Sequence, residues 1–405
     1  MSIDTGLDAG VRLLALGYAN RLKEVKQHFV GRDEVVDLLG LAALCQEHIL
    51  VIGPPGTAKT NLLDRFCQVL DTEPFSYLLT RFTEPAELFG PLNVELFQKE
   101  SIYEINTQGM LPEARVAFLD EVFQGSSAIL NTLLTLINER TFHTGRTVVR
   151  TPLVTLVGSS NEIPADPVLG AFSDRFLLRC NLDYVADDEV EEVLALGWQG
   201  ERERIARGWN EEGDAAPLTD RERTLVSIAP DDLRTLQRAV AGIDVSEVRG
   251  TYTRILQSFR AEGIAFSDRR AVRAQKLFAA SALAAGRNSA QPSDLARLVN
   301  LWTDPRDEPS IRRIVADHGV PVQESGGRVR ELFEILQVDL QELVARRDQA
   351  DSREQLHELM RQTQRLASEL RRDHPEDHEA LRTVQREQRT TVELFREKYG
   401  DEGLY

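Results

Sequence analysis

The chain has 405 residues, enough for two or three domains, and its 42% hydrophobic and 28% charged content is typical of a globular protein. Its net charge of −17 argues against a sequence-independent attraction to nucleic-acid phosphates. The three cysteines are spaced neither for a metal nor for pairing, and no apolar run approaches the roughly 20 residues that span a bilayer. We therefore expect a soluble, cytoplasmic protein.

The first predicted elements are two helices, residues 7–29 and 34–46, joined by a loop that contains Val30 and Gly31. A short apolar strand at 48–52 follows, and a further helix is predicted from 61 to 70. Between this strand and this helix lies a loop rich in glycine and proline, composed of Gly53, Pro54, Pro55, Gly56, Thr57, Ala58, Lys59 and Thr60 and followed by Asn61.

A glycine-rich turn between a strand and a helix is the usual context of a phosphate-binding loop, because its backbone N–H groups converge at a helix N-terminus. Lys59 is expected to reach the outer phosphates of a nucleotide, and the Thr60 hydroxyl is expected to ligate Mg²⁺. Ala58 stands where the usual G-x-x-x-x-G-K-[ST] pattern has its second glycine. We expect the turn to tolerate Ala58 if its φ angle is negative. The alternative is a glycine loop that only caps the helix.

Four more apolar strands are predicted at 75–80, 116–119, 153–157 and 176–180, in alternation with helices such as the amphipathic segment 127–139. Near-continuous apolar strands are typical of a parallel sheet that helices cover on both faces. The sequence therefore predicts an α/β nucleotide-binding domain with a five-stranded parallel sheet over residues 1–186.

Two adjacent carboxylates, Asp120 and Glu121, follow the strand at 116–119. An acid at the carboxyl end of a parallel strand faces the same crevice as the phosphate loop. We expect Asp120 to hold Mg²⁺ and Glu121 to polarise the attacking water as a general base. The alternative is an acidic turn at the surface.

The rest of the chain is predicted to be helical. Four helices over residues 187–303 form an all-α lid domain, and residues 304–405 form a charged C-terminal extension. Within the extension, Leu356, Leu359, Thr363, Leu366 and Leu370 have coiled-coil spacing, and a break near residues 373–376 predicts a helical hairpin. The hairpin either packs on its own chain or binds a partner.

Taken together, residues 10–302 resemble an AAA+ ATPase of the MoxR family, most closely its RavA-like branch. The resemblance implies a P-loop AAA+ module with ATP and Mg²⁺ as cofactors. It also implies a ring, expected to be a hexamer, that remodels protein clients in a chaperone-like manner alongside a partner with a von Willebrand factor A domain. No resemblance extends to residues 304–405.

The resemblance also assigns roles to single residues. Asn161 corresponds to sensor 1, Arg175 to an arginine finger that acts in the neighbouring subunit's site, and Arg269 to sensor 2, with Arg270 as the competing choice. Val30 and Gly31 correspond to the adenine pocket. The alternatives are a turn or helix cap at Asn161 and an ion pair between Arg175 and an acid such as Asp174.

Two further segments match hairpin insertions of the family. Residues 103–113 correspond to the insertion in helix 2, and residues 140–151 to the hairpin before sensor 1. Hairpins of this kind commonly contact substrate near the pore of the ring.

Two other functions stay open. One is a nucleic-acid motor, in which Arg140, Arg146 and Arg150 would contact phosphates; the net charge and the absence of a recognised DNA-binding module argue against it. The other is a nucleotide-gated interaction scaffold, in which turnover is incidental and the extension recruits partners.

Overall fold

The computed structural model describes residues 7–145, 147–164, 166–185, 189–207, 227–322, 389–392 and 395. Contacts divide the chain into two units, residues 1–323 and 324–405. In the second unit, residues 389–392 and 395 are helical, and Thr391 and Phe395 are buried. The predicted coiled-coil positions 356–370 and the predicted break at 373–376 lie outside the described residues.

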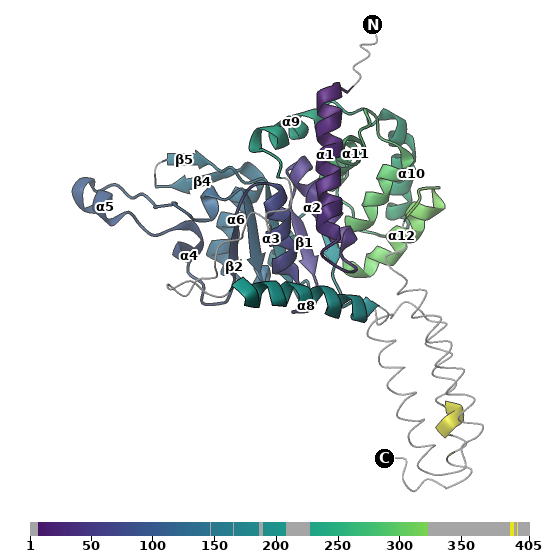
Figure 1. Ribbon diagram of the computed structural model, residues 1–405, viewed down its shortest axis with the longest axis horizontal. Helices are drawn as coiled ribbons and strands as arrows, with labels where there is room; N and C mark the ends of the chain where they lie inside the picture. The colour runs from purple at the N-terminus through teal and green to yellow at the C-terminus, as the bar shows by residue number, and fades with distance from the viewer. Residues whose placement is uncertain are drawn as a thin grey trace. The chain divides into compact units, whose positions relative to one another are not determined.

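The first unit is built on a five-stranded sheet (Figure 1). Its strands are β1 (Ile49–Ile52), β2 (Pro74–Leu78), β3 (Val116–Asp120), β6 (Thr155–Ser160) and β7 (Leu178–Asn181). All four pairings are parallel, in the order β2-β3-β6-β1-β7. The predicted α/β fold is therefore confirmed, and the carboxyl ends of all five strands lie at one edge.

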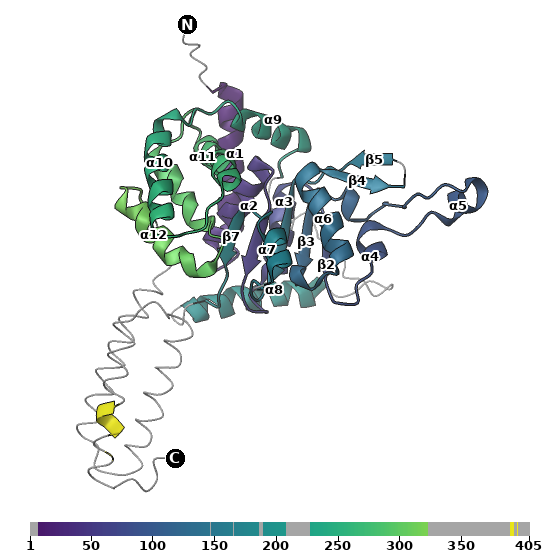
Figure 2. The ribbon, with the colours of Figure 1, turned by 180° about the vertical axis from the view of Figure 1, so that it is seen from behind.

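Helices cover both faces of this sheet, because side chains alternate along each strand between two separate cores. Ile49 and Val51 point to the face covered by α1 (Ala9–Lys26), α2 (Asp33–Cys45) and α3 (Lys59–Val69), whereas Leu50 points to the opposite face. That opposite face carries α6 (Ser127–Glu139) and α7 (Pro167–Ser173), as the view from behind shows (Figure 2). Short 3₁₀ turns at Leu111–Glu113 and Val122–Gln124 flank β3.

Two hairpins extend from this domain. The first runs over residues 91–106, where Asn93 N donates to Glu104 O at 2.7 Å, and it follows α4 (Pro85–Phe89) and carries α5 (Val94–Glu100) at its tip (Figure 1). The insertion predicted at 103–113 therefore begins about ten residues earlier. The prediction missed it because a helix, not a turn, occupies the tip.

The second hairpin lies within 140–151, as predicted, and pairs β4 (Thr141–Thr144) with β5 (Thr147–Arg150). Arg140 holds its base, because its guanidinium donates to the carbonyls of Gln46, Leu153 and Val154, and burial lowers its pKa to about 10. Arg140 is thus engaged inside the protein and not free for a phosphate backbone. Arg150 is exposed, and Arg146 lies outside the described residues.

The helical lid comprises α9 (Pro230–Val240), α10 (Ser246–Ala261), α11 (Asp268–Ala284) and a 3₁₀ segment, Pro292–Asn300. The helix α8 (Val190–Arg207) precedes it. After a 3₁₀ turn at Pro305–Asp307, α12 (Glu308–Asp317) packs on α10 through buried Ile311, Ile314 and Val315. Helical structure packed on the lid therefore continues past residue 303, the predicted end of the lid, because these apolar residues are spaced by three and four within a charged segment. None of the helices among the described residues combines the length and apolar character required to traverse a bilayer.

Candidate nucleotide site

The glycine-rich loop follows β1, and its first residue leaves no room for a side chain. Gly53 N donates to Ser160 O at 3.0 Å, and a Cβ on Gly53 would lie 2.0 Å from the carbonyl oxygen of Leu182. Gly56 has a φ angle of +81° and Ala58 one of +62°. The expectation of a negative φ at Ala58 is therefore wrong; the alanine occupies a left-handed conformation that costs about 1 kcal/mol relative to glycine.

The loop offers unpaired donors beside a cation. Within the described part of the chain, the backbone N–H groups of Gly56, Thr57 and Ala58 donate to no protein acceptor. Lys59 Nζ donates to Gly53 O at 2.7 Å. Burial lowers the pKa of Lys59, and the nearby carboxylates of Asp120 and Glu121 partly offset this effect. Convergent N–H groups and a lysine form an anion-binding arrangement.

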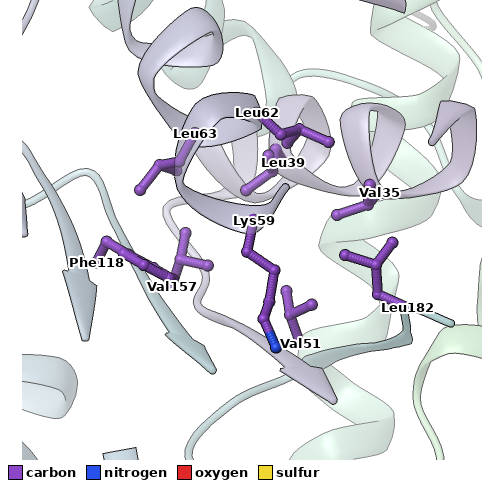
Figure 3. A pocket seen from close by; sticks show the side chains of 9 residues that line it. All are labelled: Val35, Leu39, Val51, Lys59, Leu62, Leu63, Phe118, Val157 and Leu182. Carbon is purple, nitrogen blue, oxygen red and sulfur yellow. The ribbon is translucent and has the colours of Figure 1, made fainter. Parts of the chain in front are cut away.

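The burial of Lys59 has a visible cause. An apolar cavity between α2, α3 and the sheet adjoins its aliphatic stem (Figure 3). The other lining residues are Val35, Leu39, Val51, Leu62, Leu63, Phe118, Val157 and Leu182. This apolar surrounding weakens the solvation of the ammonium group, which strengthens its attraction to phosphate or carboxylate oxygens.

The two carboxylates at the end of β3 occupy different environments. Asp120 Oδ1 accepts a hydrogen bond from the Ser159 hydroxyl on β6 and another from Glu121 N at 3.1 Å. Glu121 has a φ angle of +50°, and its Oε1 accepts from Asn161 Nδ2 at 2.9 Å. The structure thus brings Lys59, Asp120, Glu121 and Asn161 together. The sequence analysis gave no role to Ser159. Its position at the end of the same strand, two residues before Asn161, could have indicated that it lies in the site.

These residues fit Mg²⁺ and a nucleoside triphosphate. Thr60, exposed in the first turn of α3, and Asp120 offer the one or two oxygen ligands that Mg²⁺ takes from protein when phosphates and water supply the others. Among the described residues, no group of three or more His, Cys, Asp or Glu side chains is placed to hold a metal ion by itself.

Val30 and Gly31 adjoin this site through the segment after β7. Arg32 Nη2 donates to Asp183 O at 2.9 Å, and Tyr184 Oη donates to Pro55 O at 3.3 Å. One short segment therefore contacts both the phosphate loop and the loop expected to hold adenine.

Arg175 and Arg269 lie elsewhere. The parallel register pairs Ile49 with Leu178 and Ile52 with Asn181, so Arg175 lies beyond the amino end of β7 while the phosphate loop follows the carboxyl end of β1. At about 3.3 Å per residue, the steps of a four-residue strand separate these two ends by about 10 Å. Arg269 lies near Arg175, since burial and then the charge of Arg175 lower the pKa of Arg269. Neither arginine joins the phosphate loop of its own chain.

Arg270, the residue after Arg269, makes a structural contact within its own chain. Arg270 is buried and donates to Asp174 Oδ1 at 2.9 Å, whereas Arg269 is exposed and donates to Asn138 Oδ1 at 2.8 Å. Asp174 is thus paired with Arg270 and not with Arg175.

The comparisons with known proteins agree with this geometry. A family model described as "MoxR domain in the MoxR-vWA-beta-propeller ternary systems" matches residues 18–216, and an AAA lid domain model matches residues 246–315. An uncharacterized protein of Methanocaldococcus jannaschii is 32% identical over 291 residues, 71% of each chain. This chain belongs to the MoxR family of AAA+ ATPases. Its RavA-like branch stays a prediction.

Two further similarities place this MoxR-family chain among its relatives. The chaperone MoxR1 of Mycobacterium tuberculosis is 26% identical over 175 residues, covering 42% of this chain and 45% of its own. A crystal structure of a candidate ATPase from Cytophaga hutchinsonii matches 78% of this chain and 98% of its own, with a TM-score of 0.56 at 19% identity. The latter likeness supports the AAA+ fold alone.

Proposed function

We propose that this MoxR-family chain hydrolyses ATP at a site shared between adjacent copies in a ring, expected to be a hexamer. One observation carries the proposal. The phosphate loop lies at the carboxyl end of the sheet, whereas the two candidate phosphate-contacting arginines, Arg175 and Arg269, lie near its amino end. Head-to-tail packing would bring one copy's arginines to the next copy's nucleotide, and such heterologous contacts close into rings.

The roles of the residues follow from their chemistry. Val30 and Gly31 would contact adenine, the N–H groups from Gly53 to Asn61 and the Lys59 ammonium would bind the phosphates, and Thr60 and Asp120 would hold Mg²⁺. Bound Mg²⁺ supplies charge neutralisation at the β- and γ-phosphates. Glu121 orients the attacking water, and Asn161 holds the Glu121 carboxylate and meets the γ-phosphate.

Arg175, and with it Arg269, would enter from the neighbouring copy. A guanidinium stays charged at neutral pH and stabilises the charge that develops on the transferring phosphoryl group. Sensor 2 then acts between subunits, and the exposed Arg269 suits this role better than the buried Arg270.

We infer that the ring remodels protein clients in a chaperone-like manner. The family model's name refers to systems that contain a vWA component, and this supports a partner with a von Willebrand factor A domain. The projecting tip of the 91–106 hairpin exposes Val94 and Phe97, side chains that suit contact with an unfolded polypeptide. The internal engagement of Arg140 weakens the nucleic-acid alternative.

The test compares wild type with Glu121→Gln, and with Glu139→Gln as a matched carboxylate control on α6. We expect Glu121→Gln to bind a fluorescent ATP analogue in the presence of Mg²⁺ while losing hydrolysis by a factor of about 100 or more. Glu139→Gln should retain both. Full hydrolysis by Glu121→Gln would refute the assignment, and salt-sensitive binding of duplex DNA would favour the nucleic-acid motor.

A further inference from the structure

Two buried guanidiniums, those of Arg179 and Arg270, hold the segment that carries Arg175, and only that of Arg270 binds the carboxylate next to Arg175. We propose that Arg270 is a positioning residue for the arginine finger: it acts through Asp174 to fix Arg175 for hydrolysis in the neighbouring subunit's site. The proposal rests on the shared site proposed above.

Arg270 contacts both sides of the finger. Its Nη2 donates to Asp174 Oδ1 at 2.9 Å, immediately before Arg175, and its Nη1 donates at 3.4 Å to the carbonyl of Leu177, two residues after it. The same Nη1 donates to the carbonyls of Leu301 at 2.9 Å and Trp302 at 3.2 Å. The Arg270 side chain, 3% exposed, therefore joins the finger segment to the lid, and Arg179 makes a second link between the carbonyls of Ser173 and Thr303.

The backbone around the finger is already fixed by packing. Phe172 and Phe176 are buried, with ring centroids 5.5 Å apart, and Arg175 N donates to Phe172 O at 3.0 Å. What Arg270 adds is control of the Asp174 carboxylate. Because the backbone is fixed, only the direction of the Arg175 guanidinium can vary, and catalysis depends on that direction.

The charge of Asp174 explains why that control matters. About a third of its side chain is exposed, and it neighbours a finger whose Nε is buried without a hydrogen-bond partner. A carboxylate released from Arg270 would be drawn to Arg175, and the finger would then be paired within its own chain. Arg270 thus keeps the finger available by occupying its nearest competing anion.

Arg269 provides a second reason for exact placement. Burial and then the charge of Arg175 lower the pKa of Arg269, so the two guanidiniums repel each other and the direction of the finger depends on the groups around it. Arg269 and Arg270 are adjacent on α11. The lid therefore sets the position of Arg269 directly and that of Arg175 through Arg270.

The experiment uses full-length Arg270→Lys and Asp174→Asn, with Arg273→Lys as the matched control on the same helix. Lysine keeps the charge of Arg270 but cannot make the forked contacts. We expect Arg270→Lys to lose at least about tenfold in kcat with the KM for ATP changed less than about twofold, because its own phosphate loop is intact. Asp174→Asn removes the competing carboxylate, so it should keep kcat within about twofold of wild type. Arg273→Lys should turn over ATP normally.

Subunit mixing separates positioning from general damage. A ring that mixes Arg270→Lys with Glu121→Gln contains sites with an intact Glu121 from one copy and an intact finger from the other. We expect activity to return on mixing, as it should for Arg175→Ala mixed with Glu121→Gln. Should Arg270→Lys fail to fold, Asp174→Asn still tests the role, because a roughly tenfold or greater loss of kcat, by about the factor expected for Arg270→Lys, without the competing carboxylate would overturn it.

Each result decides one question. If Arg175→Ala regains activity on mixing and Arg270→Lys does not, the positioning role is overturned while the shared site stands. If Arg270→Lys keeps wild-type kcat, or if Asp174→Asn loses kcat as Arg270→Lys does, the positioning role is overturned as well. If Arg175→Ala itself is fully active alone, the shared site fails, and the positioning role fails with it.

Discussion

A buried carboxylate at the start of β1 links the α/β domain to the lid. Glu47 is 1% exposed and accepts hydrogen bonds from Arg273 Nε at 3.2 Å, from Arg273 Nη2, and from Lys276 Nζ at 2.8 Å. Both cations belong to α11 in the lid. We call these three residues the Glu47 cluster and predict that Arg273→Met destabilises the folded chain markedly.

The magnitude follows from what the substitution leaves behind. Removing one partner of a buried ion pair costs about 3–5 kcal/mol, because the remaining charge stays buried. Because Lys276 still contacts Glu47, we expect the free energy of unfolding to fall by about 3 kcal/mol, the lower end of this range. At about 2–4 °C per kcal/mol for domains of this size, the melting temperature should fall by about 6–12 °C.

Thermal unfolding followed by circular dichroism at pH 7 measures this loss. Lys276→Met is the matched control, because the Lys276 side chain is 51% exposed and that of Arg273 only 20%. We expect Lys276→Met to cost less than about 1 kcal/mol. An unchanged melting temperature for Arg273→Met, or a larger loss for Lys276→Met, would refute the reasoning.

Three further outcomes follow from single positions. Gly53→Ala should abolish binding of a fluorescent ATP analogue, because the new Cβ meets the Leu182 carbonyl, whereas Gly56→Ala, which meets no atom within 4 Å, should keep measurable binding. Ala58→Gly should preserve ATP hydrolysis and raise the melting temperature slightly, since it relieves about 1 kcal/mol at a φ of +62°. Burial lowers the pKa of the His48 imidazole well below its usual range, so the unfolded chain binds a proton below about pH 6.5 that the folded chain does not. Stability should therefore fall on acidification by up to about 1.4 kcal/mol per pH unit, and in His48→Gln this contribution should be missing from melting curves recorded between pH 7.5 and 5.

The sequence was sufficient to predict features that depend on a few consecutive residues. The five strands are short apolar runs, and the phosphate loop and the Asp120–Glu121 pair each occupy a few consecutive residues. Their types and order determine the parallel sheet and place the loop and the carboxylates at the same edge.

Contacts between distant segments could not be predicted from the sequence. Ser159 and Asp120 are 39 residues apart, and Arg270 and Asp174 are 96 apart, so no local pattern indicates either pair. The φ angle of Ala58 depends on how the loop meets α3, and only the three-dimensional structure reveals it.

The 91–106 hairpin and α12 were obscured for another reason. The hairpin carries a helix at its tip, which hides the alternation expected of paired strands, and α12 has three buried apolar residues within a charged segment. In both cases the tertiary contacts outweigh the local composition.

The most direct test of the shared site is the specific rate of ATP hydrolysis measured as a function of protein concentration, for wild type and Arg175→Ala. A site completed by a neighbouring copy predicts a wild-type rate per chain that rises with concentration to a plateau, and an Arg175→Ala rate that stays near background throughout. A rate per chain that is constant down to the lowest concentration, with Arg175→Ala as active as wild type, would contradict the account.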